Sequence, residues 1–220
     1  MNAALDSDSV AQYLADHPQF FEEHAGLLGQ VKLSSPLTGK AVSLQERQME
    51  VMRDKYRMLE LRMAELIRLA QENATIANKF HAWTQALLRA RDPASLPRTV
   101  ADSLREIFQV PQVTLRLWDV SAAYAGDWFT AGVSDDARLF AASLRAPYCG
   151  SNNDFEAVRW LDDAAGVQST AILPLRADDS AFGLLILGST DPSRFTSAMA
   201  TDFLVHIGET AGAALAALRA

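Results

Sequence analysis

Residues 49–87 read MEVMRDKYRMLELRMAELIRLAQENATIANKFHAWTQAL and carry a heptad ladder. One set of positions begins at Met49 and recurs every seven residues, and a second set begins three residues later at Met52. The members, in chain order, are Met49, Met52, Tyr56, Leu59, Met63, Leu66, Ala70, Asn73, Ala77, Phe80, Thr84 and Leu87. Spacing of this kind forms the a/d seam of a coiled coil. We therefore predict one long helix over residues 43–91 that pairs with a second copy of the chain.

The predicted helix has a start signal and a pairing signal. Ser43 and Glu46 have the spacing of a capping box, and no proline or glycine follows before Arg91. In a parallel dimer Lys55 would face the partner's Glu60, but the charges leave parallel and antiparallel pairing open. The residues assigned to the dimer contact are Met49, Met52, Tyr56, Leu59, Met63, Leu66, Asn73 and Phe80.

The composition is that of an ordinary globular chain of 220 residues, with 49% hydrophobic and 21% charged residues. No apolar run reaches the roughly 18 residues that a membrane span needs. The first ten residues lack the basic and apolar regions of a secretory signal. The single cysteine fits a reducing compartment. We therefore expect a cytoplasmic protein that has no contact with a membrane.

The formal net charge of -7 is unevenly distributed. Residues 43–91 hold nine Lys and Arg against six Asp and Glu, which gives +3. Their signs are mixed, and Glu65 and Arg68 are spaced for an ion pair on the solvated helix face. A nucleic-acid-binding protein usually shows a stronger basic patch, so we expect no nucleic-acid partner.

The chain divides into three segments by pattern. Residues 1–42 predict short helices, with a break at His17-Pro18 and a loop at 34–39. Residues 43–91 form the long helix, and residues 92–220 alternate helical and strand patterns. The elements expected in the last segment are helices at Ser95–Phe108, Ser134–Ala142, Asp154–Leu161 and Thr196–Leu218, and strands at Val113–Trp118, Asp127–Ala131, Thr170–Leu175 and Phe182–Gly188. We predict an α+β fold, with helices on one face of an antiparallel sheet.

Several short motifs, separated along the chain, occur in a characteristic order. They are Tyr13-Leu14, His17-Pro18, Phe20-Phe21, Ser43-Leu44, Glu46-Arg47-Gln48, Pro147-Tyr148-Cys149-Gly150, Gly183–Ser189, Asp191 and Arg194-Phe195. Over nearly the whole chain this order resembles a bacterial GAF-like family known as domain of unknown function 484. The resemblance implies short N-terminal helices and a long coiled-coil-like helix, followed by a GAF-like domain, and it implies a dimer. It implies no activity.

GAF domains usually build their ligand pocket between the sheet and the crossover, here residues 132–165. The candidate ligand-binding residues are Arg116, Trp128, Phe129, Arg145, Tyr148, Cys149, Asn152 and Asp154. Arginine suits a carboxylate or phosphate, and the aromatic residues suit the apolar walls of a pocket. In the competing interpretation Asn152 and Asp154 belong to a turn, and Cys149 is a small buried thiol. No metal-ligand spacing occurs among the four histidines, and no cofactor can be identified.

Two functional hypotheses remain open. The first is a dimeric cytosolic sensory or regulatory protein that binds an unidentified small molecule and passes a signal through the long helix to a partner protein. The alternative is a non-enzymatic scaffold whose GAF-like pocket is filled by its own side chains. We do not expect an enzyme, because the one plausible chemistry is redox chemistry at Cys149, and a lone cysteine needs a second thiol to complete it.

Overall fold

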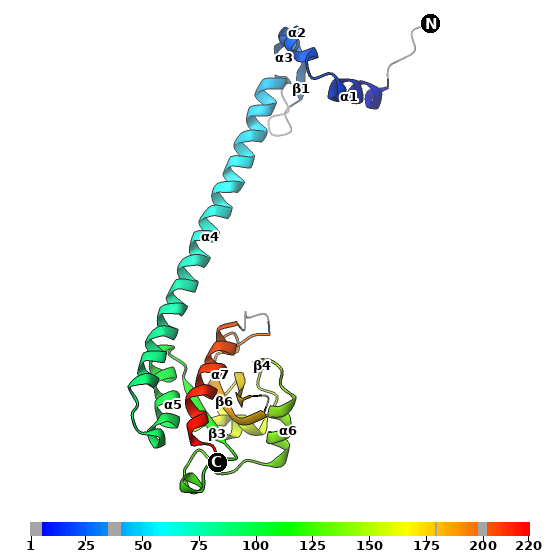
Figure 1. The fold of residues 1–220 in the computed structure, drawn as a ribbon. Helices are drawn as coiled ribbons and strands as arrows, with labels where there is room; N and C mark the ends of the chain where they lie inside the picture. The colour runs from blue at the N-terminus through cyan, green and yellow to red at the C-terminus, as the bar shows by residue number, and fades with distance from the viewer. Residues whose placement is uncertain (1–5, 35–40, 179, 198–201) are drawn as a thin grey trace. The chain divides into compact units, whose positions relative to one another are not determined.

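The computed structural model describes residues 6–34, 41–178, 180–197 and 202–220. It divides the chain into two compact units, residues 1–72 and 73–220, and the division falls inside one long helix. Figure 1 shows the elements of both units. The division into three segments remains a prediction, because it follows the sequence pattern, whereas the two units follow the compactness of the structure.

The first unit begins with short helices. They are α1 (Ser7–Asp16), α2 (Phe20–Glu23) and α3 (Ala25–Gln30). The predicted break at His17-Pro18 is confirmed, because α1 ends at Asp16 and the residue before a proline avoids the helical region. A ribbon of β1 (Lys32–Ser34) and β2 (Ala41–Ser43) follows, with Leu33 opposite Val42. The sequence did not predict this ribbon, and most of the predicted loop at 34–39 lies outside the described residues.

Helix α4 runs without interruption over Leu44–Arg89, which is 46 residues. At 1.5 Å per residue it is about 70 Å long. The prediction of one continuous helix is therefore confirmed. The predicted capping box begins at Ser43, whose side chain lies outside those described.

The second unit is a four-stranded antiparallel sheet with helices, which confirms the α+β prediction. Its sheet order is β3-β6-β5-β4, and all neighbours are antiparallel. The strands are β3 (Gln112–Leu117), β4 (Tyr148–Ser151), β5 (Ser169–Ala177) and β6 (Ser180–Ser189). The α-helices are α5 (Leu96–Ile107), α6 (Asp135–Ser143) and α7 (Asp202–Leu215), and the 3-10 helices are η1 (Pro93–Ser95), η2 (Ala122–Tyr124), η3 (Glu156–Trp160), η4 (Ala164–Gly166) and η5 (Ala216–Leu218).

Helices cover both faces of the sheet, so the prediction of one covered face is wrong. The first core lies between the sheet and α5, α7 and the end of α4, and includes Trp83, Leu87, Val100, Leu104, Leu115, Leu173, Leu185, Ile207 and Leu215. The second core lies between the sheet and α6, η3 and the residues that flank η4, and includes Trp118, Ala141, Val158, Leu161, Val167, Ile172, Leu184 and Ile186. Because side chains of a strand alternate between faces, β6 supplies both cores. Figure 1 shows α6 and α7 on different sides of the strands.

Two local predictions are also wrong. Residues Asp127–Ala131 form turns rather than a strand, and a single backbone hydrogen bond of 2.7 Å joins them to β3, from Leu117 N–H to the Phe129 carbonyl. The Thr130 hydroxyl donates to the Asp127 carbonyl at 2.8 Å and holds the turn closed. Conversely, the segment around Cys149 is the edge strand β4, which is absent from the strands that the sequence predicts.

Gly212 gives a test of how closely α7 packs on β5. A Cβ at this position would lie 2.7 Å from the Arg176 carbonyl oxygen, which is backbone and cannot rotate away. We expect Gly212→Ala to destabilise the protein by about 1–3 kcal/mol, despite the gain of about 1 kcal/mol in helix propensity. Denaturant unfolding measures the difference.

Gly126→Ala is the matched control, because nothing lies within 4 Å of its added Cβ. Its free energy of unfolding should stay close to that of the unchanged protein. A Gly212→Ala protein as stable as the control would show that α7 does not lie this close to β5.

Candidate functional site

The N-terminal part of the a/d seam is exposed on α4. Its six large apolar side chains, each 56–65% exposed, are Met49, Met52, Tyr56, Leu59, Met63 and Leu66. Asn73 is also exposed. Phe80, by contrast, packs within the second unit, with its ring centroid 5.8 Å from that of Trp83 and 6.4 Å from that of His206. The ladder therefore has an exposed stretch from Met49 to Leu66 and an end that belongs to the first core.

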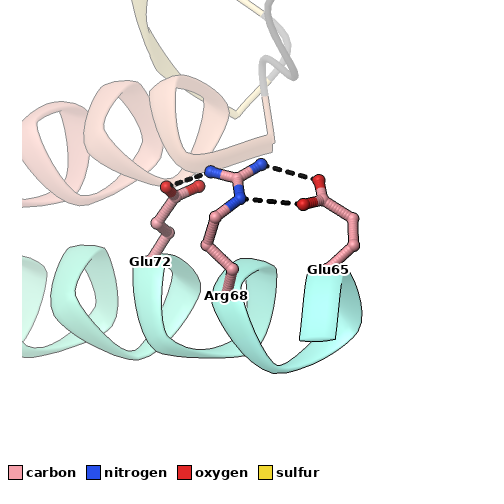
Figure 2. Close-up of polar contacts among 3 residues, drawn as sticks. All are labelled: Glu65, Arg68 and Glu72. Atoms are coloured by element: carbon pink, nitrogen blue, oxygen red, sulfur yellow. Dashed lines mark hydrogen bonds and ion pairs between the residues drawn. The ribbon is translucent and has the colours of Figure 1, made fainter. Parts of the chain in front are cut away.

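The opposite surface of α4 is mixed: it exposes the apolar side chains of Met58 and Leu61, and one turn further along it carries a charged cluster. Figure 2 shows Arg68 between Glu65 and Glu72. Its Nη2 and Nε nitrogens donate to the two carboxylate oxygens of Glu65 at 2.7 and 2.9 Å, and its Nη1 nitrogen pairs with Glu72. The hydrogen bonds from Arg68 lower the pKa of Glu65. Exposed pairs of this kind add little stability, so we read them as marking the solvent face of the helix.

The space where the resemblance expected a ligand pocket is largely filled. Ile172, Leu184 and Ile186 of the sheet are fully buried beneath Val158 and Leu161. A cavity of about 190 Å³ remains between α6 and η3. This volume is below the roughly 300–1,000 Å³ of typical ligand pockets. The crossover therefore serves mainly as a cover for the second core.

Tyr148 lies beside this cover and is engaged locally. Its hydroxyl donates to the Ser151 carbonyl at 2.9 Å and accepts from the Asn153 side-chain amide at 3.1 Å. Its ring packs against Phe155 with centroids 4.8 Å apart.

Asn152 and Asp154 form a turn. The Asn152 amide donates to the Val167 carbonyl at 3.1 Å, and its oxygen accepts from the Asp154 backbone N–H at 3.1 Å. Asp154 has a φ of 58° and pairs with exposed Arg159 at 2.7 Å. These contacts favour the turn interpretation for both residues.

Two further candidates, Phe129 and Cys149, belong to the first core. Phe129 is 1% exposed and Cys149 is 8% exposed. Burial raises the pKa of the Cys149 thiol to about 11. Its thiolate, which is the reactive form, is therefore strongly disfavoured at neutral pH.

Arg145 lines a separate cavity of about 440 Å³ between α7, β5 and the loop before β4. The other arginine of this cavity, Arg176, is engaged: its Nη2 donates to the Ala142 and Leu144 carbonyls at 3.1 and 2.8 Å, at the end of α6. Two carboxylates, Asp178 and Glu209, also line the cavity. Its charge is therefore mixed.

Arg116 and Trp128 are the two candidates that the structure brings together. They lie in a cleft of about 320 Å³ along the free edge of β3. The full lining is Arg98, Ala101, Asp102, Arg105, Val113, Thr114, Arg116, Trp128, Trp160 and Asp162. The Arg116 guanidinium lies 5.7 Å from the ring centroids of both Trp128 and Trp160. Burial lowers the pKa of Arg116.

Sequence reasoning missed Arg98, Arg105 and Trp160. The two arginines are seven residues apart on the polar side of α5, a spacing that puts them on one face. Trp160 ends η3 and reaches Arg116 only through the fold.

Neither a metal site nor a membrane span is found among the described residues. In the parts of the chain that the structure describes, no group of three or more His, Cys, Asp or Glu is placed to hold a metal ion. Across the same described parts, no helix combines the length and the apolar character needed to cross a membrane.

The burial of Cys149 predicts slow thiol chemistry. Because its pKa is about 11 rather than the ordinary 9.0, the folded protein should hold about 100-fold less thiolate near neutral pH. Ellman's reagent at pH 8 should therefore react at least that much faster after unfolding in guanidinium. Equal rates in the folded and unfolded protein would show that the thiol is accessible and ordinary.

Comparison with known proteins gives one family and several likenesses. The uncharacterized protein YigA of Salmonella typhimurium is 25% identical over 209 residues, which span 92% of this chain and 88% of that protein. The GAF domain of a proposed sensor histidine kinase from Pseudomonas syringae pv. tomato matches with a TM-score of 0.43 and 17% identity, over 68% of this chain and 91% of that one. The GAF domain of the potassium sensor histidine kinase KdpD from Escherichia coli matches with a TM-score of 0.42 and 16% identity, over 64% and 94%.

At TM-scores below 0.5 these likenesses say nothing about a ligand or an activity. The family is shown by sequence: the profile described as "Protein of unknown function, DUF484" matches residues 1–215. The resemblance found in the motifs is thereby confirmed, and the chain belongs to the DUF484 family.

Proposed function

We propose that this chain is a homodimeric cytoplasmic regulatory protein. In this proposal two copies pair along α4, the sheet domain takes a small molecule, and α4 passes the change to the N-terminal segment (residues 7–30) and so to a partner protein. The observation that carries the proposal is the exposed seam from Met49 to Leu66. A continuous exposed apolar stripe usually marks a protein contact, and a/d spacing fits a second copy of the same helix.

The core of the sheet domain supports the signalling part of the proposal. Trp83 is fully buried and Leu87 is 5% exposed in the first core, although both belong to α4. A change in that core therefore acts directly on the end of the helix. Helices packed along their length have discrete alternative arrangements, which suits a switch.

An exposed aromatic cluster in the N-terminal segment supports the part of the proposal in which a partner protein binds there. Tyr13 stacks on His17 with ring centroids 4.3 Å apart, and Phe20 contacts His24 at 4.7 Å. Tyr13 is 53% exposed, and α1 and α2 have no buried residue. Aromatic residues are enriched in protein interfaces, so this cluster is the surface we assign to the partner.

Charge placed on the seam should break the dimer. Leu66→Glu puts a carboxylate at a d position, where pairing would bury it without a partner. We expect the dimer dissociation constant to rise about 100-fold or more, which corresponds to about 2.7 kcal/mol. Sedimentation velocity over a range of concentrations measures the change.

Leu61→Glu is the matched control. Leu61 is 62% exposed and Leu66 is 65% exposed, but Leu61 lies at an f position on the other side of the helix. The Leu61→Glu protein should remain dimeric. Equal weakening by both substitutions, or a monomer in the unchanged protein, would rule out the seam as the contact.

The filled second core favours the scaffold alternative over a ligand held beneath the crossover. Ile172, Leu184 and Ile186 have no exposed surface there, and the remaining cavity of about 190 Å³ is small. Under this alternative the dimer works through α4 and the N-terminal segment alone. Neither reading assigns a reaction to the protein, and neither gives Cys149 a catalytic role.

Mass spectrometry separates the two readings. If the protein binds a small molecule, native spectra of the purified dimer should show an added mass that disappears under denaturing conditions. A dimer with no added mass, purified from cells at their natural metabolite concentrations, would favour the scaffold.

A further inference from the structure

We propose that the cleft along the free edge of β3 binds a small molecule bearing a carboxylate or phosphate group, with the anionic group against Arg116 and the rest of the molecule against Trp128. This inference rests on the small-molecule part of the proposed function. It gives that part a location and a ligand class, and the location is the free edge of β3 rather than the space between the sheet and the crossover.

Arg116 carries a charge that no carboxylate among the described residues compensates. The Arg116 guanidinium is partly buried, and its hydrogen-bond acceptors are all neutral: the Ala131 carbonyl at 3.0 Å, the Leu115 carbonyl at 2.9 Å and the Thr114 hydroxyl at 3.2 Å. Among the described residues no carboxylate pairs with it, and its Nη2 nitrogen has no acceptor. Removing a charge from water without a counter-charge is costly. An anion in the cleft would supply the counter-charge.

The charged side chains that line the cleft also favour an anion. Arg98 and Arg105 of α5 line the cleft with Arg116, and Asp102 and Asp162 oppose them, which gives the lining a net formal charge of +1. Arg105 pairs with Asp162 at 3.8 Å, so Arg98 and Arg116 are the arginines that remain for an anion. The chain as a whole has a formal net charge of -7. The cleft is therefore a local positive site on an acidic protein, and such a field attracts anions.

The free edge of β3 favours a small molecule over a peptide as the occupant of the cleft. An extended peptide would have to pair with the free edge of β3. That edge is already engaged: the Val113 carbonyl accepts from Arg105 at 3.2 Å, the Leu115 carbonyl accepts from Arg116, and the Leu117 N–H donates to Phe129. Side chains that occupy an edge in this way prevent strand addition. The cleft volume of about 320 Å³ suits a small molecule instead.

The two tryptophans supply the apolar wall. Trp128 is 39% exposed and Trp160 is partly buried, and the Arg116 guanidinium lies equally far from both rings. This arrangement holds the guanidinium in place before a ligand arrives, which reduces the entropy lost on binding. It also leaves the exposed indole surface of Trp128 available to a planar or apolar part of the ligand.

The tryptophans also provide the signals with which anion binding in the cleft can be tested. The chain has four tryptophans, and two of them, Trp83 and Trp118, are buried in the two cores away from the cleft. Full-length protein labelled with ¹⁵N is titrated with inorganic phosphate and, separately, with succinate, and chloride at equal ionic strength is the blank. We expect saturable shifts of the Trp128 and Trp160 indole N–H resonances in the millimolar range. The resonances of Trp83 and Trp118 should not move.

Arg116→Gln removes the charge and should weaken binding of phosphate and succinate at least 10-fold. The matched control is Arg159→Gln, which removes an exposed arginine paired with Asp154 outside the cleft lining. Unchanged Trp83 and Trp118 resonances show that the variants fold. Arg98→Gln, at an exposed position on α5, should also weaken binding and does not depend on the packing around Arg116.

Three outcomes would contradict the proposal that the cleft binds an anion. They are the absence of shifts with both anions, shifts equal to those of chloride, and shifts that survive Arg116→Gln. Shifts with phosphate alone or with succinate alone would support the cleft and name the ligand group. A ligand mass on the native dimer that survives Arg116→Gln would sustain the proposed function and reject this site, so the two failures can be told apart.

Discussion

Residues 182–187 of β6 have to be covered on both faces, because the sheet turns Leu184 and Ile186 to one side and Leu185 and Leu187 to the other. Each fully buried side chain of this size contributes about 1.5–3 kcal/mol. Leaving either face bare would lose several such contributions, which is comparable to the whole net stability of a domain. The helices on both sides of the sheet follow from this requirement.

The requirement also limits where a ligand can bind. The crossover between β3 and β5 supplies α6 and η3, and their apolar side chains, with Leu161 and Val167, close the second core. Enlarging the cavity there would expose sheet residues that are now fully buried. The lateral edge of β3 does not have to cover the second core, and the cleft along it is lined mostly by charged and aromatic side chains. Binding at the edge therefore leaves the core packing intact.

The elements that sequence predicts well are those with a long or regular period. Helix α4 has heptads without a glycine or proline, and the β5–β6 hairpin joins two apolar runs across a polar turn. Strand β4 was missed because its four residues include Gly150 and show no alternation. The turn at 127–131 was taken for a strand because Trp128, Phe129 and Thr130 all have high strand propensity.

The candidate site is harder to predict than the elements. Arg116 and Trp128 could be named from sequence because each stands out by residue type. Their neighbours Arg98, Arg105 and Trp160 come from α5 and η3, and only the packing of those elements against β3 brings them together. The filled space beneath the crossover could not be predicted for the same reason. No local sequence pattern tells whether a loop region closes over a cavity or over a core.

Helix α4 carries an exposed seam at one end and residues of the first core at the other. This combination constrains the length of the helix as well as its sequence. Each residue inserted into an α-helix turns everything beyond it by about 100°. One residue added between Leu66 and Phe80 would therefore break the heptad register that the exposed seam shares with Phe80 and Leu87. Seven added residues would restore that register to within about 20°. Among relatives that keep both features, changes in helix length should therefore come in whole heptads.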